Sequence, residues 1–276
     1  MTLRAALQSD YPAFVALFPE LHVDELVPDE AKWWATLGPQ TLVIDEHGLV
    51  VAYVYFQILA GTGYIRHVVV HPDHRGRGLG LRLLNAVAER LRAAHCTTWC
   101  LNVKPDNAAA LALYQRVGMR TAYSSAAVRF TWDLVDRLPN SDLSLTTCRI
   151  DPSEDAALER AMGLPQGQLA NHRLAPTRID LRLHDPADPP NLGLGLASFV
   201  PSFPGAFPFR VARPSLARPL LAGMRTHALP EFNHVQIVIE NDAPLLDLLV
   251  ANGARIHMTF LHLEGPLPLC EEHNVH

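Results

Sequence analysis

The stretch HPDHRGRGLGLRLL, His71–Leu84, decides how the first half of this chain folds. It follows an apolar run, Ile65–Val70, with the composition of a buried strand, and the residues after it continue at helical spacing. Three glycines and three arginines lie at this junction. A helix that begins at such a turn directs unpaired backbone N–H groups and its positive dipole end at one point. The junction therefore predicts an anion site.

The spacing of the glycines limits which anion the turn can bind. Arg75-Gly-Arg-Gly78-Leu-Gly80 fits neither the dinucleotide fingerprint nor the nucleoside-triphosphate loop. Two histidines, His71 and His74, fall inside the same turn. We expect no metal there, because a zinc site would need further ligands at regular spacing.

Outward from the junction, the first half alternates between strand and helix patterns. Strands are expected at 2–7, 41–45, 49–58, 63–70, 97–103, 121–125 and 127–132, and helices at 11–18, 28–37 and 107–117. The helix after the turn has an apolar face made of Leu79, Leu83, Leu84, Val87 and Leu91. This order predicts an α/β fold (α+β, with a mixed sheet) whose antiparallel part comes early and whose helical crossover follows the fourth strand.

Two segments resemble the GNAT-type acyl-CoA N-acyltransferase superfamily. VVVHPDHRGRGLG is similar to its pyrophosphate loop, R/Q-x-x-G-x-G/A after a strand ending V-x-P, with Arg75, Gly78 and Gly80 at the fixed positions. NAAALALYQRVGM, residues 107–119, is similar to its N-x-x-A-x-x-L-Y-x-x-x-G-F segment, with Met119 in place of the usual aromatic residue. The resemblance covers about the first half of the chain.

The resemblance implies acetyl-CoA, or a related acyl-CoA, as donor substrate, and no metal. Two backbone segments and one side chain would hold this donor. The backbone of the strand end, Val68, Val69 and Val70, would line the pantetheine and acetyl group. The amides of the turn would bind the pyrophosphate, and they belong to Arg75, Gly76, Arg77, Gly78, Leu79 and Gly80. The side chain of Asn107 would bond the pantetheine arm.

Tyr114 is the candidate catalytic acid. It lies two helical turns after Asn107, so both side chains project from nearly the same face. A phenol of pKa about 10 can protonate a departing thiolate, which is the role that the resemblance implies. The alternative is a tyrosine that only packs on the sheet.

The general base stays open at this level. Some relatives place a carboxylate five residues before the asparagine, where this chain has Asn102. His67 is a candidate by its ordinary pKa, although it can equally be a core histidine, and a water chain can serve instead. Five acids, Glu20, Asp24, Glu25, Asp29 and Glu30, fall where the family builds its acceptor site. They either recognise a cationic amine or form a solvated face.

The second half repeats the order of the first. Strands are expected near 145–150, 178–184, 193–200, 206–211 and 234–240, and helices near 153–162 and 215–226. Asp242–Gly253 has the length of Asn107–Gly118, at an offset of 135 residues. Asp242 replaces Asn107, Leu249 replaces Tyr114, and ARPS stands where the glycine turn would be.

We therefore expect tandem GNAT-like folds, each a mixed, mostly antiparallel sheet flanked by helices. Residues 1–136 would form the catalytic N-acetyltransferase domain. Residues 145–276 would form a degenerate domain without the pyrophosphate loop. Such a chain would be a monomer with pseudo-twofold halves, or a homodimer, because a fused silent copy can supply the partner surface of a dimer.

Composition excludes several other classes. A net charge of -5 offers no overall attraction for nucleic acid or an acidic membrane. The four cysteines form no CxxC pair, and no signal peptide pattern opens the chain, which predicts a cytoplasmic protein. The predicted function is transfer of an acetyl group from acetyl-CoA to a primary amine on a small molecule. The alternatives are a protein or peptide N-terminal acetyltransferase, and a non-catalytic acyl-CoA-binding protein.

Overall fold

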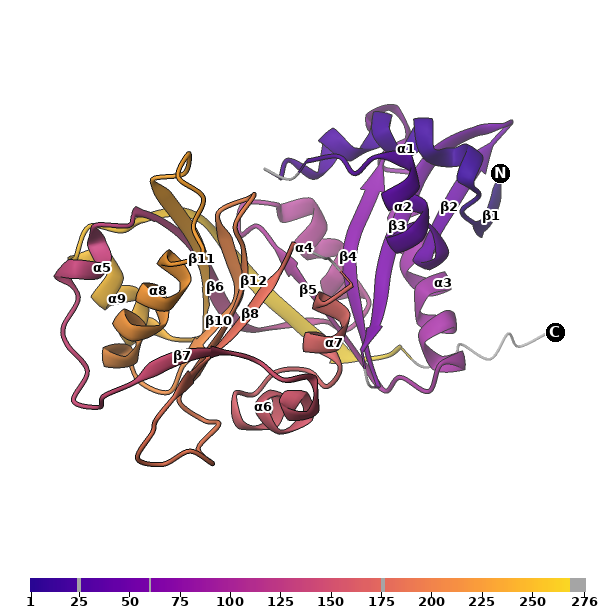
Figure 1. Cartoon of the computed structure of the whole chain (residues 1–276). Coiled ribbons are helices and arrows are strands. Elements are labelled where there is room, and N and C mark those ends of the chain that lie inside the picture. The colour runs from indigo at the N-terminus through magenta and orange to yellow at the C-terminus, as the bar shows by residue number, and fades with distance from the viewer. Residues whose placement is uncertain (24–25, 60, 175–176, 269–276) are drawn as a thin grey trace. The chain divides into compact units, whose positions relative to one another are not determined.

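The computed structural model describes residues 1–23, 26–59, 61–174 and 177–268. Its contacts divide the chain into two compact units (Figure 1). Unit 1 is Met1–Ala122 together with the chain from Leu261 onward, and unit 2 is Tyr123–Phe260. Each unit contains a mixed sheet with helices on both faces, which confirms the predicted fold class.

The sheet of unit 1 has the order β1-β2-β3-β4-β5-β12, and β4 and β5 pair in parallel while its other neighbouring strands are antiparallel. The strands are β1 Thr2–Ala5, β2 Thr41–Glu46, β3 Leu49–Leu59, β4 Thr62–Val70, β5 Thr98–Val103 and the second half of β12, Arg255–Pro266. The helices are α1 Tyr11–Leu17, α2 Glu30–Thr36, α3 Leu79–Ala93 and α4 Ala108–Arg116.

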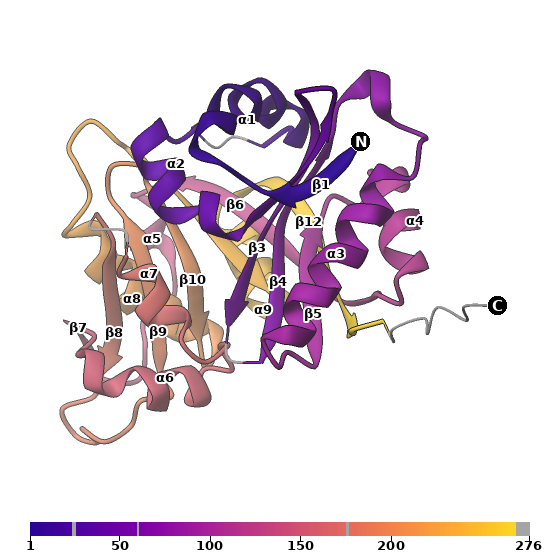
Figure 2. The ribbon, with the colours of Figure 1, turned by 90° about the vertical axis from the view of Figure 1, so that its right-hand side faces the viewer.

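The two faces of this sheet carry different helices (Figure 2). Helices α3 and α4 pack on one face, and α1 and α2 pack on the other. All five residues of the predicted apolar stripe of α3 are buried, namely Leu79, Leu83, Leu84, Val87 and Leu91. Because side chains alternate along a strand, each core strand contributes to both packing layers.

Unit 2 has the order β7-β8-β9-β10-β11-β6, again with one parallel pair, β10 and β11. The strands are β6 Arg120–Thr131, β7 Thr146–Arg149, β8 Ile179–His184, β9 Gly195–Val200, β10 Gly205–Val211 and β11 His234–Glu240. The helices are α5 Leu134–Arg137, α6 Asp155–Ala161, α7 Gln168–His172, α8 Ala217–Arg225 and α9 Ala243–Ala251. Helices α5, α8 and α9 share the main core, and α6 and α7 cover the other face.

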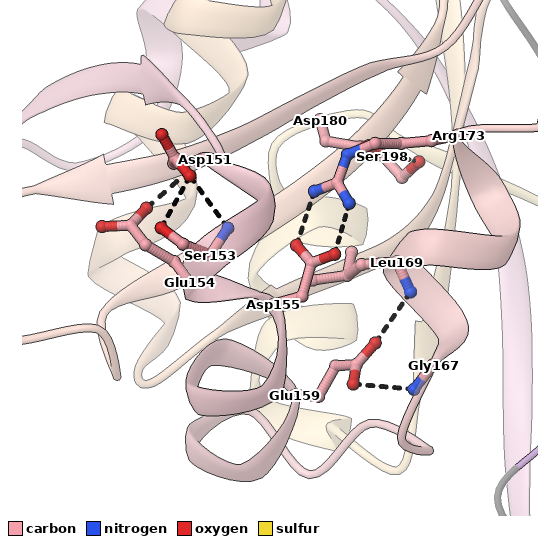
Figure 3. Close-up of polar contacts among 10 residues, drawn as sticks. All are labelled: Asp151, Ser153, Glu154, Asp155, Glu159, Gly167, Leu169, Arg173, Asp180 and Ser198. Carbon is pink, nitrogen blue, oxygen red and sulfur yellow. Dashed lines mark hydrogen bonds and ion pairs between the residues drawn. The ribbon is translucent and has the colours of Figure 1, made fainter.

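Helix α7 was not expected from the sequence, because five residues are too few for a periodic pattern. A buried carboxylate fixes it in place (Figure 3). Glu159 of α6 accepts hydrogen bonds from the amides of Gly167 and Leu169, both at 2.8 Å, where the start of a helix leaves N–H groups unpaired. Arg173, just after α7, pairs with Asp155. The hydrogen-bonding groups of these side chains are therefore paired with partners inside unit 2.

The last strands of the two halves are exchanged. Residues Ser125–Thr131 of β6 pair with β11 in unit 2, and Leu261–Pro266 of β12 pair with β5 in unit 1. Helices α4 and α9, and strands β6 and β12, match at an offset of 135 residues, which confirms the tandem repeat. The borders of the compact units thus differ from the predicted segments 1–136 and 145–276, because each half completes its sheet with a strand from the other.

One expected element is wrong. The two short strands at 121–125 and 127–132 form a single strand, β6. The ladder with β11 continues from Ser125 to Thr131 without a break. Among the described residues, none of the helices has both the length and the apolar character that crossing a membrane requires.

Candidate functional site

Strands β4 and β5 run together for only four residue pairs, from Thr62–Thr98 to Ile65–Leu101. At that point β4 has a bulge, since Phe56 of β3 pairs with Ile65 while Tyr55 pairs with His67. The bulge bends β4 away from β5. We call the place where the two strands separate, after Ile65 and Leu101, the β4–β5 divergence.

The backbone beyond the bulge faces this divergence at alternate residues. The amide of His71 donates to the carbonyl of Val51 in β3 at 2.9 Å. Because alternate residues of a strand direct their backbone groups to opposite edges, Val69 also faces β3, and Val68 and Val70 face the divergence. The carbonyl of Val70 accepts from Arg75 Nε at 3.1 Å. Of the three predicted strand residues, Val68 and Val70 thus direct their backbone groups to the divergence, whereas Val69 faces β3 within the sheet.

The turn after β4 has the geometry of an anion site. Gly76 and Gly78 adopt left-handed backbone angles, with φ of 74° and 75°, and Gly78 is the N-cap of α3. The first amide of this helix with a backbone acceptor is that of Arg82, which donates to the carbonyl of Gly78 at 3.1 Å. Within the described part of the chain, the amides from Gly76 to Leu81 have no hydrogen-bond acceptor. Six consecutive N–H groups are therefore available to a phosphate.

Gly80 has a packing role as well. A Cβ atom at this position would lie 2.9 Å from Cδ2 of Leu113 in α4. The missing side chain lets α3 and α4 approach each other beside the turn. This fixes the position of α4, which carries Asn107 and Tyr114.

The arginine side chains of the turn are paired with carboxylates. Arg75 contacts Glu20 at 2.5 Å, and Arg77 contacts Glu46 through both terminal nitrogens, at 3.0 and 2.8 Å. Arg77 holds the pKa of the Glu46 carboxyl below its usual range. Sequence reasoning assigned charge to the arginines but missed Glu46, which lies 31 residues earlier. The backbone amides, rather than free guanidinium groups, are the main donors of this turn.

Asn107 and Tyr114 lie on α4 as predicted. Asn107 caps the helix, since its Oδ1 accepts from the amide of Ala110 at 3.1 Å, which leaves its side-chain NH2 to donate elsewhere. Tyr114 is buried in the core between α3, α4 and the sheet. Burial raises the pKa of its phenol well above the ordinary value, so the group stays protonated, as an acid must.

The predicted acidic group does not form a cluster of free carboxylates. Glu20 pairs with Arg75, Asp29 caps α2 through the amide of Lys32, and Glu30 accepts from Gln8. Asp24 and Glu25 lie outside the described residues. The described members therefore serve local structure.

His67 is held among aromatic rings. Its ring lies 5.7 Å from Phe18 and 5.3 Å from Tyr55, measured between centroids. Burial lowers the pKa of His67 to about 4, so the side chain is neutral at pH 7 and a poor acceptor of a proton. Its buried Nδ1 also has no hydrogen-bond partner among the described residues, so no polar group stabilises a charged ring, and this environment favours the core histidine over the general base.

A polar triplet that the sequence did not reveal lies at the divergence. Asn102 of β5 donates from Nδ2 to the hydroxyl of Tyr64 in β4 at 3.0 Å, and its Oδ1 lies 2.9 Å from Nδ1 of His262 in β12. Asn102 and His262 are 160 residues apart, so no local pattern connects them. Among the described residues, no group of three or more His, Cys, Asp or Glu side chains is placed to hold a metal ion.

Comparison with known proteins finds relatives for the first part of the chain. Residues 3–119 match the family Acetyltransferase (GNAT). Over 95 residues, 34% of the chain, the sequence is 36% identical to a mycothiol acetyltransferase from Saccharopolyspora erythraea, of which it covers 31%. Over 86 residues, 29% of the chain, it is 34% identical to the L-amino acid N-acyltransferase MnaT from Escherichia coli, of which it covers 50%. The chain thus spans half or less of the length of these curated relatives.

A solved structure extends the likeness to the whole chain. A tandem GNAT protein from the clavulanic acid biosynthesis pathway aligns with 96% of this chain and 98% of its own, with a TM-score of 0.62 and 20% identity. This identity is low, so the match concerns the fold. The fold of both halves is the tandem one.

Proposed function

We propose that residues 3–119, which match the Acetyltransferase (GNAT) family, form a GNAT domain and that the chain transfers the acetyl group of acetyl-CoA to a primary amine on a small molecule. The observation that carries the proposal is the row of unpaired amides from Gly76 to Leu81 beside the β4–β5 divergence. The amides fit a pyrophosphate. The divergence offers the backbone of Val68 and Val70 to an extended chain such as pantetheine, which would bind as an added strand does.

In this proposal Tyr114 protonates the departing thiolate. Its raised pKa keeps the proton on the phenol until a strong base forms nearby, and a thiolate leaving from the thioester is such a base. Asn107 would bond the pantetheine arm through its side-chain NH2. One curated relative is named an L-amino acid N-acyltransferase, and this supports a small amine as acceptor.

The second half would bind no donor and serve the first. The exchange of β6 and β12 supports a single chain that contains its own partner. We expect a monomer of 30.5 kDa, which light scattering after gel filtration measures directly.

The test is a turnover assay. Release of free CoA thiol from acetyl-CoA is followed with a panel of amino acids, other small amines and short peptides, and each product is identified by mass spectrometry. We expect turnover with small amines. Turnover with peptides alone would replace the small acceptor by a protein N-terminus. Acetyl-CoA binding with no turnover on any acceptor would contradict the enzyme and support a binding protein.

A further inference from the structure

The triplet Tyr64–Asn102–His262 fixes the protonation of a histidine beside the proposed reaction site. Asn102 Nδ2 donates to the tyrosine hydroxyl, so Oδ1 is the atom that faces His262. An amide oxygen only accepts, and Nδ1 of His262 must therefore carry a hydrogen. In a neutral imidazole with Nδ1–H, the basic lone pair is on Nε2. Asn102 thus holds His262 in the tautomer that can take up a proton at Nε2.

The triplet lies at the place where β4 and β5 separate. Ile65 and Leu101 form the last pair between these strands, and Asn102 is the next residue of β5. Ile65 and Leu101 belong to the core under α3 and α4. Because side chains alternate, Tyr64 and Asn102 lie on the opposite face of the sheet.

The candidate acid and the histidine therefore stand on opposite sides of the divergence. Tyr114 belongs to the core between the sheet and helices α3 and α4. A thioester that passes through the divergence would meet Tyr114 from one face and His262 from the other. This suits the reaction, because the amine attacks the carbonyl carbon on one side while the thiolate leaves toward another group.

The fold itself does not require the triplet. In unit 2, Ala127 is the residue 135 positions before His262, and it pairs with Val238 of β11. Both members of this pair are apolar, and the same strands form the same ladder around them. A buried polar group costs free energy unless its hydrogen bonds are satisfied, so the first unit has a polar arrangement where an apolar pair suffices. His262 is buried, with 7% of its surface exposed.

We infer that His262 is the general base of the acetyl transfer and that Asn102 is its positioning residue; this rests on the proposed function. The amine nitrogen forms a bond to the acetyl carbon, and the positively charged nitrogen of the adduct gives its proton to His262 Nε2. The C–S bond then breaks, and the thiolate takes the proton of Tyr114. Solvent water carries the proton from His262 back to the tyrosinate, so atoms and charge balance over one turnover.

This inference gives the second half a chemical contribution. His262 lies on β12, the last strand of the second copy, and reaches unit 1 through the strand exchange. It also explains the asparagine at position 102. Asn102 is a poor base, but it is a suitable acceptor for the Nδ1–H of a histidine that is one.

The test compares the full chain with three variants in the acetyl-transfer assay across pH 5.5 to 9. His262→Gln should lower kcat about 100-fold and remove the acidic limb of the pH profile, with unchanged affinity for acetyl-CoA. His262→Ala should recover part of its rate when free imidazole is added, which a purely structural histidine would not show. Asn102→Asp should move the acidic limb to higher pH while retaining turnover, because a carboxylate beside Nδ1–H stabilises the protonated imidazole.

His257→Gln is the matched control, since it changes a histidine of the same strand that is exposed to solvent. It should leave kcat and the pH profile unchanged. If the full chain turns over but His262→Gln retains its kcat and its acidic limb, the assignment of the base is overturned and the proposed function stands. If the full chain binds acetyl-CoA but acetylates no amine, the proposed function and this inference fall together.

Discussion

In the first half, β4 leaves β5 after Ile65, and the turn that follows presents unpaired amides beginning at Gly76. In the second half, β10 pairs with β11 only at Gly205 and Ala206, so the same divergence exists. There, however, a side chain spans it. Arg210 contacts the carboxylate of Glu240 at 2.7 Å and its carbonyl oxygen at 3.1 Å.

The turns that follow differ in the same sense. Pro214 opens the turn before α8, and it has no N–H to offer. The residue before it, Arg213, has an extended backbone, and no left-handed glycine precedes the helix. Strand β10 also has a bulge, between Ala206 and Phe209, so the two halves share a bulged strand and a divergence, which belong to the topology. Among the described residues, the row of unpaired amides after this strand is present in the first half and is replaced in the second by a turn that Pro214 opens.

The largest expected effect concerns donor binding. A Gly78→Glu, Gly80→Glu double variant should raise the Kd for acetyl-CoA more than 100-fold, because the new carboxylates fill the turn and repel phosphate. Calorimetry measures both affinity and stoichiometry. We expect one acetyl-CoA per chain.

Ser215→Glu places one carboxylate at the corresponding turn of the second half and should leave binding unchanged. Circular dichroism shows whether the double variant remains folded, since Gly80 lies against Leu113. Two molecules bound per chain would break the comparison between the halves. So would full affinity in a folded double variant.

The next effect concerns the acid. Tyr114→Phe keeps the ring in its core position and removes the proton, so kcat should fall about 100-fold while the Kd for acetyl-CoA is unchanged. The residue at the same place in α9 is Leu249. Leu249→Met is the matched change in the second half, and steady-state kinetics should show no effect of it beyond a small loss of stability. A Tyr114→Phe enzyme with full turnover would leave the tyrosine as packing only.

Local features of this fold were predictable because their causes are local. The apolar stripe of α3 and the bounds of helix α4 each depend on residues within a few positions of one another. The resemblance of the turn and of α4 added the candidate site. The repeat was visible because α4 and α9 retain the same length and the same kind of cap.

The rest depended on pairings between distant strands. The sequence around Arg66 contains no local signal for the bulge, because the bulge depends on how β4 pairs with β3. Glu46 and Arg77 are 31 residues apart, and they make contact because the order of strands in the sheet brings the end of β2 near the turn after β4. His262 reaches Asn102 only because the last strands are exchanged, and a single sequence contains no signal for that exchange.

The ion pair of the second half provides a third test. Glu240 has 7% of its side chain exposed, so Glu240→Ala should lower the free energy of unfolding by about 1–3 kcal/mol because it leaves Arg210 without its carboxylate. Urea denaturation measures this. The chain should still bind a single acetyl-CoA, because opening the divergence does not restore the amides that Pro214 lacks.

Replacing both partners, as in Arg210→Met with Glu240→Leu, should recover most of the lost stability, since an apolar pair can replace a buried ion pair. In the first half, Glu46→Ala removes an ion pair at the surface and should leave the urea midpoint nearly unchanged. If Glu46→Ala lowered the free energy of unfolding more than Glu240→Ala, the first half and not the second would depend on its ion pair for stability.

The smallest expected effect concerns stability at acid pH. It compares one histidine of the first half, His67, with one of the second half, His227. The pKa of His67 is about 4 in the folded chain, below the ordinary value near 6.5, because burial disfavours the charged ring. The unfolded chain therefore binds a proton first as the pH falls, and the folded state loses stability from about pH 6.5 down to about pH 4. His67→Phe removes this titration and keeps an aromatic ring beside Phe18. Relative to its own stability at pH 8, the variant should lose about 1–2 kcal/mol less than the parent chain at pH 5. In the second half, burial also lowers the pKa of His227, but this side chain is more exposed than His67. His227→Gln should therefore change the loss of stability between pH 8 and pH 5 less than His67→Phe does. Urea denaturation at pH 5 and pH 8 measures both variants, and an acid limb that depends on His227 rather than His67 would place the acid-sensitive core in the other half.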